Sequence, residues 1–291
     1  MQRSYPRERG RLARFAILAA VFFVSVASRA QTIAAPGASL PDPNQLLQRA
    51  LSNQKKLALE QERYECRVSE TTVETDKNGN VKKTKSEIDE QFFVNGIPIE
   101  RTLSKDGKDL SPDQLKKEDE RVMKETVKYS NEATANKETN KQNQQIQDLV
   151  EAMMLTHGRR ENESGRSVLD YDIVPNPRFQ AKNLIQRFAK AMQGTIAIDE
   201  QTGEMIDLNV HSVADVKIGG GLVASLHKGF WLHIHNHSEP DGVWLNDLAE
   251  GSGDARAALF FHPYFRFTQT TGDCHLYTAK AMQVGQAKTV K

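Results

Sequence analysis

The stretch GTIAIDEQTGEMIDLNVHSV, residues 194–213, decides the fold. Apolar and polar side chains alternate on both sides of Gln201-Thr202-Gly203, and alternation with a period of two is typical of half-buried strands. Thr195 to Asp199 and Glu204 to Val213 are therefore predicted to be two antiparallel strands that are joined by a tight turn.

The same strand pattern continues toward the C-terminus. Gly219-Gly220-Gly221 interrupts it, and this triplet favours a bend or bulge because it lacks the following Lys and Ser/Thr of a phosphate-binding loop. Further strands, separated by short connections, are predicted at Leu222–Lys228, Phe230–His237, Val243–Leu248, Ala255–Phe267 and Cys274–Tyr277. This half of the chain therefore predicts a large antiparallel sheet.

The N-terminal half predicts a helix and a meander. Apolar residues at helical spacing indicate an amphipathic helix from Pro43 to about Glu62. Three strands follow, and turn residues such as Asn95-Gly96 join them. These strands are Tyr64–Thr75, Val81–Phe93 and Ile97–Leu103.

Helices are predicted in the middle of the chain. Ser111-Pro112-Asp113 is a helix start with a capping serine, and the helix should run to about Lys128. Residues 131–145 are rich in Asn, Gln and Lys and predict either a solvated helix or a mobile loop. The remaining predicted elements are a helix at Ile146–Leu155, a strand at Ser167–Pro175 and a short helix at Asn183–Met192.

Residues 1–30 have the pattern of a cleavable secretory signal peptide. Arginines precede an apolar run from Phe15 to Val24, and small residues occupy the cleavage positions in Ser28-Arg29-Ala30. This run is shorter than the ~20 apolar residues that a bilayer-spanning helix needs. We therefore expect a periplasmic or secreted protein with a flexible leader at residues 31–44 and no transmembrane span after cleavage.

The charge balance argues against a nucleic-acid partner. The chain has 39 Lys and Arg against 38 Asp and Glu, and residues 1–30 hold six arginines and one glutamate, so the mature chain carries a net charge of −4. A mildly acidic chain without a basic stripe does not attract a phosphate backbone.

Cys66 and Cys274 are the only cysteines, and they lie near opposite ends of the mature chain. An even cysteine count in an exported protein favours a disulfide, and a bridge requires Cα atoms ~4.4–6.8 Å apart. The alternative is two separate buried thiols.

Two histidines carry the strongest hint of a metal site. His233 and His235 alternate in a predicted strand and could supply two zinc ligands, with His211 or Glu239 as a third. The alternative is an ordinary polar strand face. The sequence has no nucleophile elbow, phosphate-binding loop or H-E-x-x-H motif, so a non-enzymatic protein without a cofactor is expected.

Aromatic residues gather in the C-terminal part of the chain. They either fill an ordinary core beneath the helices or line a concave sheet face that takes an acyl chain or another apolar ligand. The candidate lining residues are Trp231, Trp244, Phe261, Phe265 and Phe267.

Several of these signatures, in this order, resemble the LolA/LolB superfamily of exported bacterial proteins, which includes periplasmic lipoprotein carriers and the sensor RseB. The residues that carry the resemblance are Tyr64-x-Cys66, Phe93-Val-Asn-Gly-Ile-Pro98, Asp106-Gly-Lys-x-Leu-Ser111, Pro175-x-Pro177, Gly194-Thr-Ile-Ala-Ile-Asp199 with Gly203, and Asp241-Gly-Val-Trp244.

The resemblance implies an α+β fold, a curved antiparallel sheet that forms an incomplete β-barrel covered on its concave side by helices. A single such domain would span residues 45–280, with a helical insertion at about 111–155 and a tail at 281–291. It further implies a carrier that holds a lipid or lipoprotein acyl chain, or a sensory or structural envelope protein with a filled barrel and a protein partner.

Overall fold

A computed structural model describes residues 39–163, 165–218, 224–257 and 264–276. Several expectations lie outside the described residues: the signal peptide, leader residues 31–38, the Gly219-Gly220-Gly221 bend, Phe261 and the tail.

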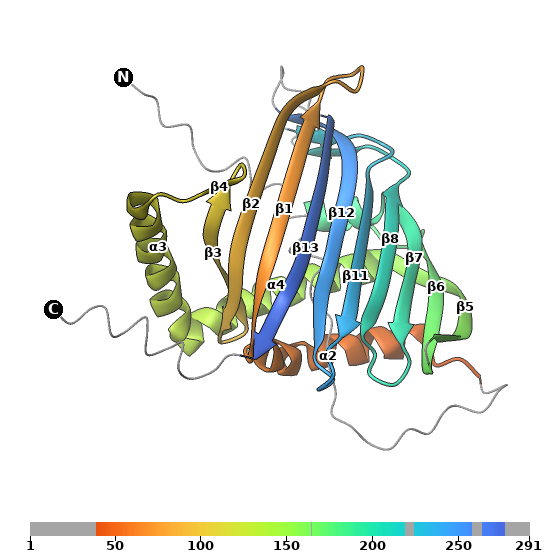
Figure 1. The fold of residues 1–291 in the computed structure, drawn as a ribbon. Helices are drawn as coiled ribbons and strands as arrows, with labels where there is room; N and C mark the ends of the chain where they lie inside the picture. Colours follow the sequence, from red (N-terminus) through yellow and green to blue (C-terminus); the bar gives the residue numbers. More distant parts are fainter. Residues whose placement is uncertain (1–38, 164, 219–223, 258–263, 277–291) are drawn as a thin grey trace.

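The described strands form one large antiparallel sheet (Figure 1). Their order is β4-β3-β2-β1-β13-β12-β11-β8-β7-β6-β5, with the short strand β10 pairing with both β12 and β9. The N-terminal strands are β1 (Tyr64–Thr75), β2 (Val81–Val94), β3 (Ile97–Lys105) and β4 (Lys108–Asp109). The others are β5 (Met153–Glu163), β6 (Arg166–Pro175), β7 (Met192–Asp199), β8 (Met205–Ser212), β9 (Val216–Ile218), β10 (Ala224–Leu226), β11 (Trp231–Ser238), β12 (Trp244–Ala257) and β13 (Tyr264–Leu276).

This arrangement confirms the predicted fold class, a large antiparallel sheet that is not closed into a barrel and is accompanied by helices. Its helices are α2 (Pro43–Gln61), α3 (Pro112–Ser130), α4 (Glu132–Ala152) and α5 (Leu184–Ala189). Helices α2 and α4 lie behind the sheet in Figure 1, and α3 stands beside β3. We name the sheet side toward α2 and α4 the covered face and the opposite side the open face.

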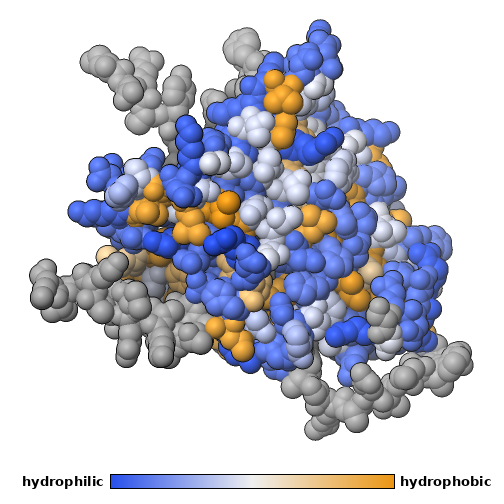
Figure 2. Space-filling view, in the orientation of Figure 1, coloured by the Kyte–Doolittle hydropathy of each residue, from blue (hydrophilic) through white to orange (hydrophobic). Residues whose placement is uncertain are grey.

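The hydrophobic core lies on the covered face. Along β11, Leu232 and Ile234 are buried, whereas His233 and His235 between them are partly exposed on the open face. Figure 2 shows a largely hydrophilic surface with scattered hydrophobic patches in this view. Most core residues come from four neighbouring strands, β6, β7, β8 and β11: Leu169, Tyr171, Ile173, Met192, Ile196, Ile198, Met205, Val210, Leu232 and Ile234. Leu46 of α2, Phe230, Ala249 of β12 and Phe267 of β13 complete the core.

Of residues 131–145, all but the first are helical and belong to α4. Asn131 caps α4 because its side chain accepts a hydrogen bond from the backbone nitrogen of Thr134, at 3.0 Å. The capping serine of α3 is also confirmed, since Ser111 accepts from Gln114 and forms a capping box with it.

Several predicted boundaries were wrong, including that of the strand expected over Val243–Leu248, which continues to Ala257 as β12. The helix expected to reach Leu155 ends at Ala152, because Met153 pairs with Pro175 and begins β5. The helix expected over 183–192 covers only 184–189, since Met192 pairs with Ser212 in β7. The strand expected over 255–267 is divided: residues 255–257 end β12, and Phe267 belongs to β13.

The last strand, β13, lies in the interior of the sheet between β1 and β12. It pairs with β1 from Tyr64 opposite Leu276 to Thr75 opposite Tyr264, with one irregularity near Cys66. It pairs with β12 from Leu248 opposite Thr270 to Asp254 opposite Tyr264. The four N-terminal strands are therefore connected to the rest of the sheet through β13.

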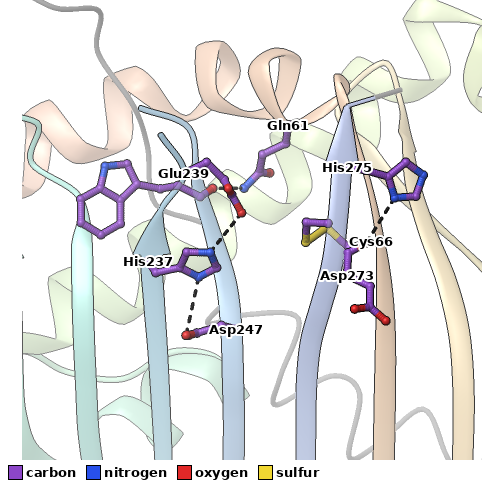
Figure 3. Close-up of a disulfide and its surroundings, with 9 residues drawn as sticks. Gln61, Cys66, His237, Glu239, Asp247, Asp273 and His275 are labelled. Carbon is purple, nitrogen blue, oxygen red and sulfur yellow. Dashed lines mark hydrogen bonds and ion pairs between the residues drawn. A yellow bond between two sulfur atoms is a disulfide. The ribbon is translucent and has the colours of Figure 1, made fainter. Parts of the chain in front are cut away.

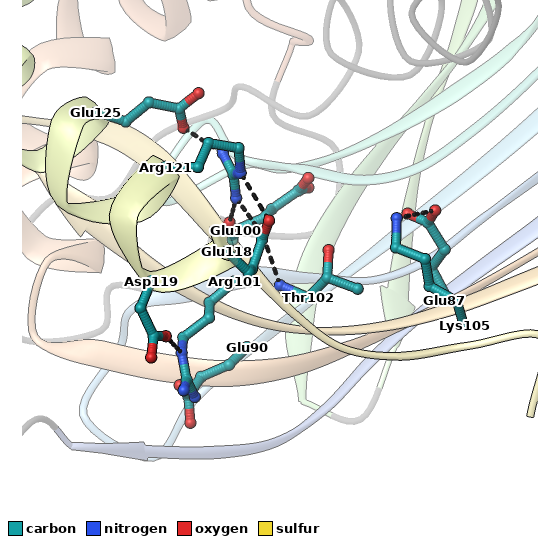
Figure 4. Close-up of polar contacts among 10 residues, drawn as sticks. All are labelled: Glu87, Glu90, Glu100, Arg101, Thr102, Lys105, Glu118, Asp119, Arg121 and Glu125. Carbon is teal, nitrogen blue, oxygen red and sulfur yellow. Dashed lines mark hydrogen bonds and ion pairs between the residues drawn. The ribbon is translucent and has the colours of Figure 1, made fainter. Parts of the chain in front are cut away.

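Side chains of α3 satisfy backbone groups on the free edge of β3 (Figure 4). The backbone nitrogen of Thr102 donates to Glu118 Oε1 at 3.1 Å, and Arg121 donates to the carbonyl oxygen of Glu100. Arg121 also forms an ion pair with Glu118 at 2.6 Å. Glu118 and Arg121 thus supply hydrogen-bond partners that a further strand would otherwise supply to β3 at this edge.

We expect Glu118→Ala to lower the free energy of unfolding by about 1–3 kcal/mol, because it leaves the buried Thr102 N–H without its acceptor. Burial opposes ionisation of Glu118, but the hydrogen bonds from Arg121 and Thr102 outweigh it and hold its pKa below the usual range. This stabilisation is therefore present above the ordinary glutamate pKa and is lost as pH falls through the lowered one.

Urea unfolding at pH 7 and pH 4 measures this effect. Glu120→Ala, on the exposed side of the same helix, is the control and should change stability by less than about 0.5 kcal/mol. Equal losses in the two variants would show that the Glu118 contacts do not protect the edge.

Candidate functional site

The candidate site is the apolar part of the covered face together with the segment that closes it, residues 39–61. Leu46 of α2 packs into the core formed by β6, β7, β8 and β11. Leu40, before the helix, packs against the same core. Leu57 and Ala58, farther along α2, are also buried. Burial of a leucine side chain contributes roughly 1.5–3 kcal/mol.

Polar contacts attach the segment at its middle and at its end. In the middle, Arg49 Nη2 donates to the carbonyl oxygen of Glu200 at 3.0 Å. At the end, Gln61 Nε2 donates to the carbonyl oxygen of Trp244 at 3.0 Å. Gly96, in the turn between β2 and β3, has a φ of +76° and packs against α2 so closely that a side chain there would collide with Ala58.

A buried carboxyl lies at the hairpin that α2 covers. Glu204, the residue before β8, is 0% exposed, and among the described residues neither of its side-chain oxygens has a hydrogen-bond partner. Burial raises the pKa of Glu204 to about 9, and the negative charges of Asp199 and Glu60 add to the shift. Such a group is buried at neutral pH in its protonated form.

The second acid of this hairpin is in a different environment. Asp199 is 2% exposed, but its carboxylate accepts hydrogen bonds from the backbone and hydroxyl of Thr202 at 2.7 and 3.0 Å. Arg166 reaches its other oxygen at 3.2 Å and also stacks over the Trp244 ring, 5.3 Å from the ring centre. One acid is thus fully compensated and the other is not, although both belong to the same turn.

The predicted aromatic residues do not form one lining. Trp244, 4% exposed, lies beside Arg166, and Phe267, 1% exposed, belongs to the core. Phe265 is partly buried against that core. Trp231 alternates with the buried Leu232 and therefore lies on the open face, because successive side chains of a strand point to opposite faces.

The histidines on β11 are paired with carboxylates. His233 lies 2.8 Å from Asp207 and 3.3 Å from Glu250, and His235 lies 2.7 Å from Asp247. Burial opposes protonation of His233, but hydrogen bonds and charges of its two acidic neighbours outweigh it and raise its pKa. These pairs make a polar strand face.

The structure does not bring the proposed zinc ligands together. His211, the predicted third ligand, lies opposite Trp231 in the β8–β11 ladder. His237 and Glu239 lie 3.1 Å apart, and Figure 3 shows them with Asp247. Within the described part of the chain, no group of three or more His, Cys, Asp or Glu side chains is arranged to hold a metal ion.

Cys66 and Cys274 form the predicted disulfide (Figure 3). Their Cα atoms are 4.1 Å apart, slightly closer than the expected range, because β1 and β13 are directly paired neighbours. Disulfides persist in oxidising compartments. The bridge therefore indicates an extracytoplasmic location.

Sequence reasoning missed Glu204 as a site residue. The hairpin was predicted from its alternation, and Glu204 was placed as the first residue of its second strand. One available signal was that Glu204 directly precedes the buried Met205, beside a turn that already contains Asp199 and Glu200. The burial of this glutamate depends on how distant segments pack around the turn, and the sequence pattern does not specify that packing.

Comparisons with known proteins add little. No family model matches the sequence. No curated protein matches it either. Among solved structures, a chain in the crystal structure of MucB in complex with MucA(peri) is similar at 11% identity and a TM-score of 0.22, over 82% of this chain and 100% of that chain. Likeness at this level carries no argument about function.

No helix within the described residues is both long enough and apolar enough to cross a bilayer.

Proposed function

We propose that this protein is an exported, non-enzymatic binding protein of the cell envelope that holds an apolar group, such as a lipid or the acyl chain of a lipoprotein. The group would occupy the space between the sheet and α2, with residues 39–61 displaced. The sequence resemblance to the LolA/LolB superfamily and the predicted signal peptide agree with this role, and the bridge between Cys66 and Cys274 agrees with a periplasmic location.

One observation supports the proposal: part of the apolar surface of the covered face is closed by residues 39–61, a segment that belongs to no strand. The strands pair with each other throughout, whereas residues 39–61 attach through side-chain packing and polar contacts. Among the described side chains, Leu40, Leu46 and Leu57 pack inward, and Arg49 and Gln61 donate hydrogen bonds. Displacing that segment would uncover the core without breaking a strand pair. Apolar sites of this kind bind ligands mainly by burying hydrophobic surface.

Native mass spectrometry and lipid extraction of the purified protein test the proposal. We expect a bound or exchangeable apolar molecule and saturable binding of N-phenyl-1-naphthylamine, an uncharged fluorescent probe. Protein that carries no lipid and does not bind the probe would contradict an apolar binding site.

A matched pair of variants locates the site. Leu208→Lys places a charge on the covered face, because Leu208 pairs with Ile196 and Ile234, and we expect it to weaken probe binding at least tenfold, roughly 1.4 kcal/mol. Leu248→Lys places the same charge opposite His235 on the open face and should leave binding unchanged. An equal loss of probe binding in both variants would show that the probe does not bind on the covered face.

A second function, a sensory or structural envelope protein with a filled barrel and a protein partner, is favoured by the complete burial of residues such as Ile234 and Phe267. In that case the interior would already be occupied by its own side chains. Absence of any bound apolar molecule, with unchanged stability on delipidation, would select this alternative.

A further inference from the structure

We propose that α2 seats on the sheet together with one proton, which Glu204 carries, so that the covered site opens as pH rises. This inference rests on the proposed function for its biological meaning, but the seating of α2 can be measured without any ligand.

The geometry that carries it is the interface between α2 and the turn that joins β7 to β8. Arg49 holds that turn through the carbonyl oxygen of Glu200, and a side chain built on Gly203 would come within 3.2 Å of Arg49 Nε. Glu204 follows directly in sequence and is fully buried with no hydrogen-bond partner among the described residues. A carboxylate in this position would leave its charge unsolvated and unpaired.

The charged groups around Glu204 do not offset the cost of ionising it in this buried position. From the hairpin, Asp199 contributes a negative charge, which Arg166 balances at 3.2 Å. From α2, Glu60 opposes ionisation of Glu204, whereas Arg49 and Lys56 favour it. Arg49 and Lys56 are both exposed, so water screens their effect. Burial and these charges together raise the pKa of Glu204 to about 9.

The sign of the coupling follows from this raised pKa. With α2 seated, Glu204 binds its proton up to about pH 9, whereas with α2 displaced it is solvated and has the ordinary glutamate pKa. Between the ordinary and the raised value, the seated state holds one more proton. Each unit of pH increase therefore shifts the equilibrium up to about tenfold toward the displaced state.

Hydrogen exchange of the α2 backbone amides tests the seating directly. After correction for intrinsic exchange, we expect protection of residues 43–61 to fall up to about 100-fold from pH 6 to pH 8, relative to the β7 and β8 amides. Glu204→Gln removes the ionisable group and should leave α2 protection independent of pH. If the glutamine variant fails to fold, Glu204→Met also removes the ionisable group and replaces it with an apolar side chain of similar size.

Glu161→Gln is the matched control, because Glu161 is an exposed glutamate on β5 and should retain the wild-type pH dependence. Constant α2 protection in the wild type, or a pH dependence that survives in Glu204→Gln, would overturn the proposal.

Binding of N-phenyl-1-naphthylamine separates this inference from the proposed function. If both hold, the probe binds up to about 100-fold more tightly at pH 8 than at pH 6, and Glu204→Gln abolishes the difference. If the protection of α2 falls with rising pH in the wild type and not in Glu204→Gln, but the probe never binds, the proposed function fails and the proton coupling stands. Equal probe binding at both pH values, with constant protection, refutes the coupling and keeps the function.

Discussion

Reduction of the bridge between Cys66 and Cys274 is expected to lower the free energy of unfolding by about 5 kcal/mol. The two cysteines are 208 residues apart, and in the chain-entropy model a loop of this length constrains the unfolded state strongly. For a domain of this size, the loss corresponds to a decrease in melting temperature of roughly 10–20 °C.

Thermal unfolding with and without reductant measures the loss. The double variant Cys66→Ser/Cys274→Ser should melt at the lower temperature under both conditions, which controls for other effects of the reductant. A melting temperature that does not change on reduction of the wild type would show that the bridge does not stabilise the protein as the chain-entropy model requires.

Gly194→Ala is expected to destabilise the protein by at least ~3 kcal/mol. A Cβ atom at Gly194 would lie 1.8 Å from the carbonyl oxygen of Asn209 and 2.7 Å from the Cα atom of Val210, both on the neighbouring strand β8. Neither is the movable end of a side chain, so β7 and β8 would have to separate. Urea unfolding, or the yield of soluble protein, reports the effect.

Gly272→Ala is the control for that substitution. Gly272 lies in β13, and a Cβ atom there would meet no atom within 4 Å. We expect a change below about 1 kcal/mol in either direction, since alanine loses less backbone entropy on folding than glycine. Similar losses at both positions would mean that the close approach at Gly194 is relieved by small backbone shifts.

The sequence predicts most strands correctly because each hairpin carries its own local signal. Residues 194–213 contain both the period-two alternation and the glycine turn that β7 and β8 use. The N-cap of α3 is equally local, since Ser111 and Gln114 satisfy each other. Where an element ends depends on its partner, so the helix boundary at Ala152 could not be predicted without knowing that Met153 pairs with Pro175.

The candidate site was predicted less well, because it depends on contacts between distant segments. The aromatic residues were grouped by their closeness in sequence, but Trp231 lies on the open face and Trp244 lies beside Arg166. Glu204 becomes unusual through burial in the folded protein and through charges that include Glu60 of α2, about 150 residues earlier in the chain. The pairing of Cys66 with Cys274 was predictable for a different reason: only one disulfide is possible with two cysteines.

The interior position of β13 also determines the order of events when the chain is made. A chain exported N-terminus first delivers β1 long before residues 264–276 emerge, and until then one edge of β1 and one edge of β12 have no partner. Long-range pairing of this kind is slow and leaves unpaired edges exposed. For a chain that emerges N-terminus first, the complete sheet can therefore form only after β13 has emerged.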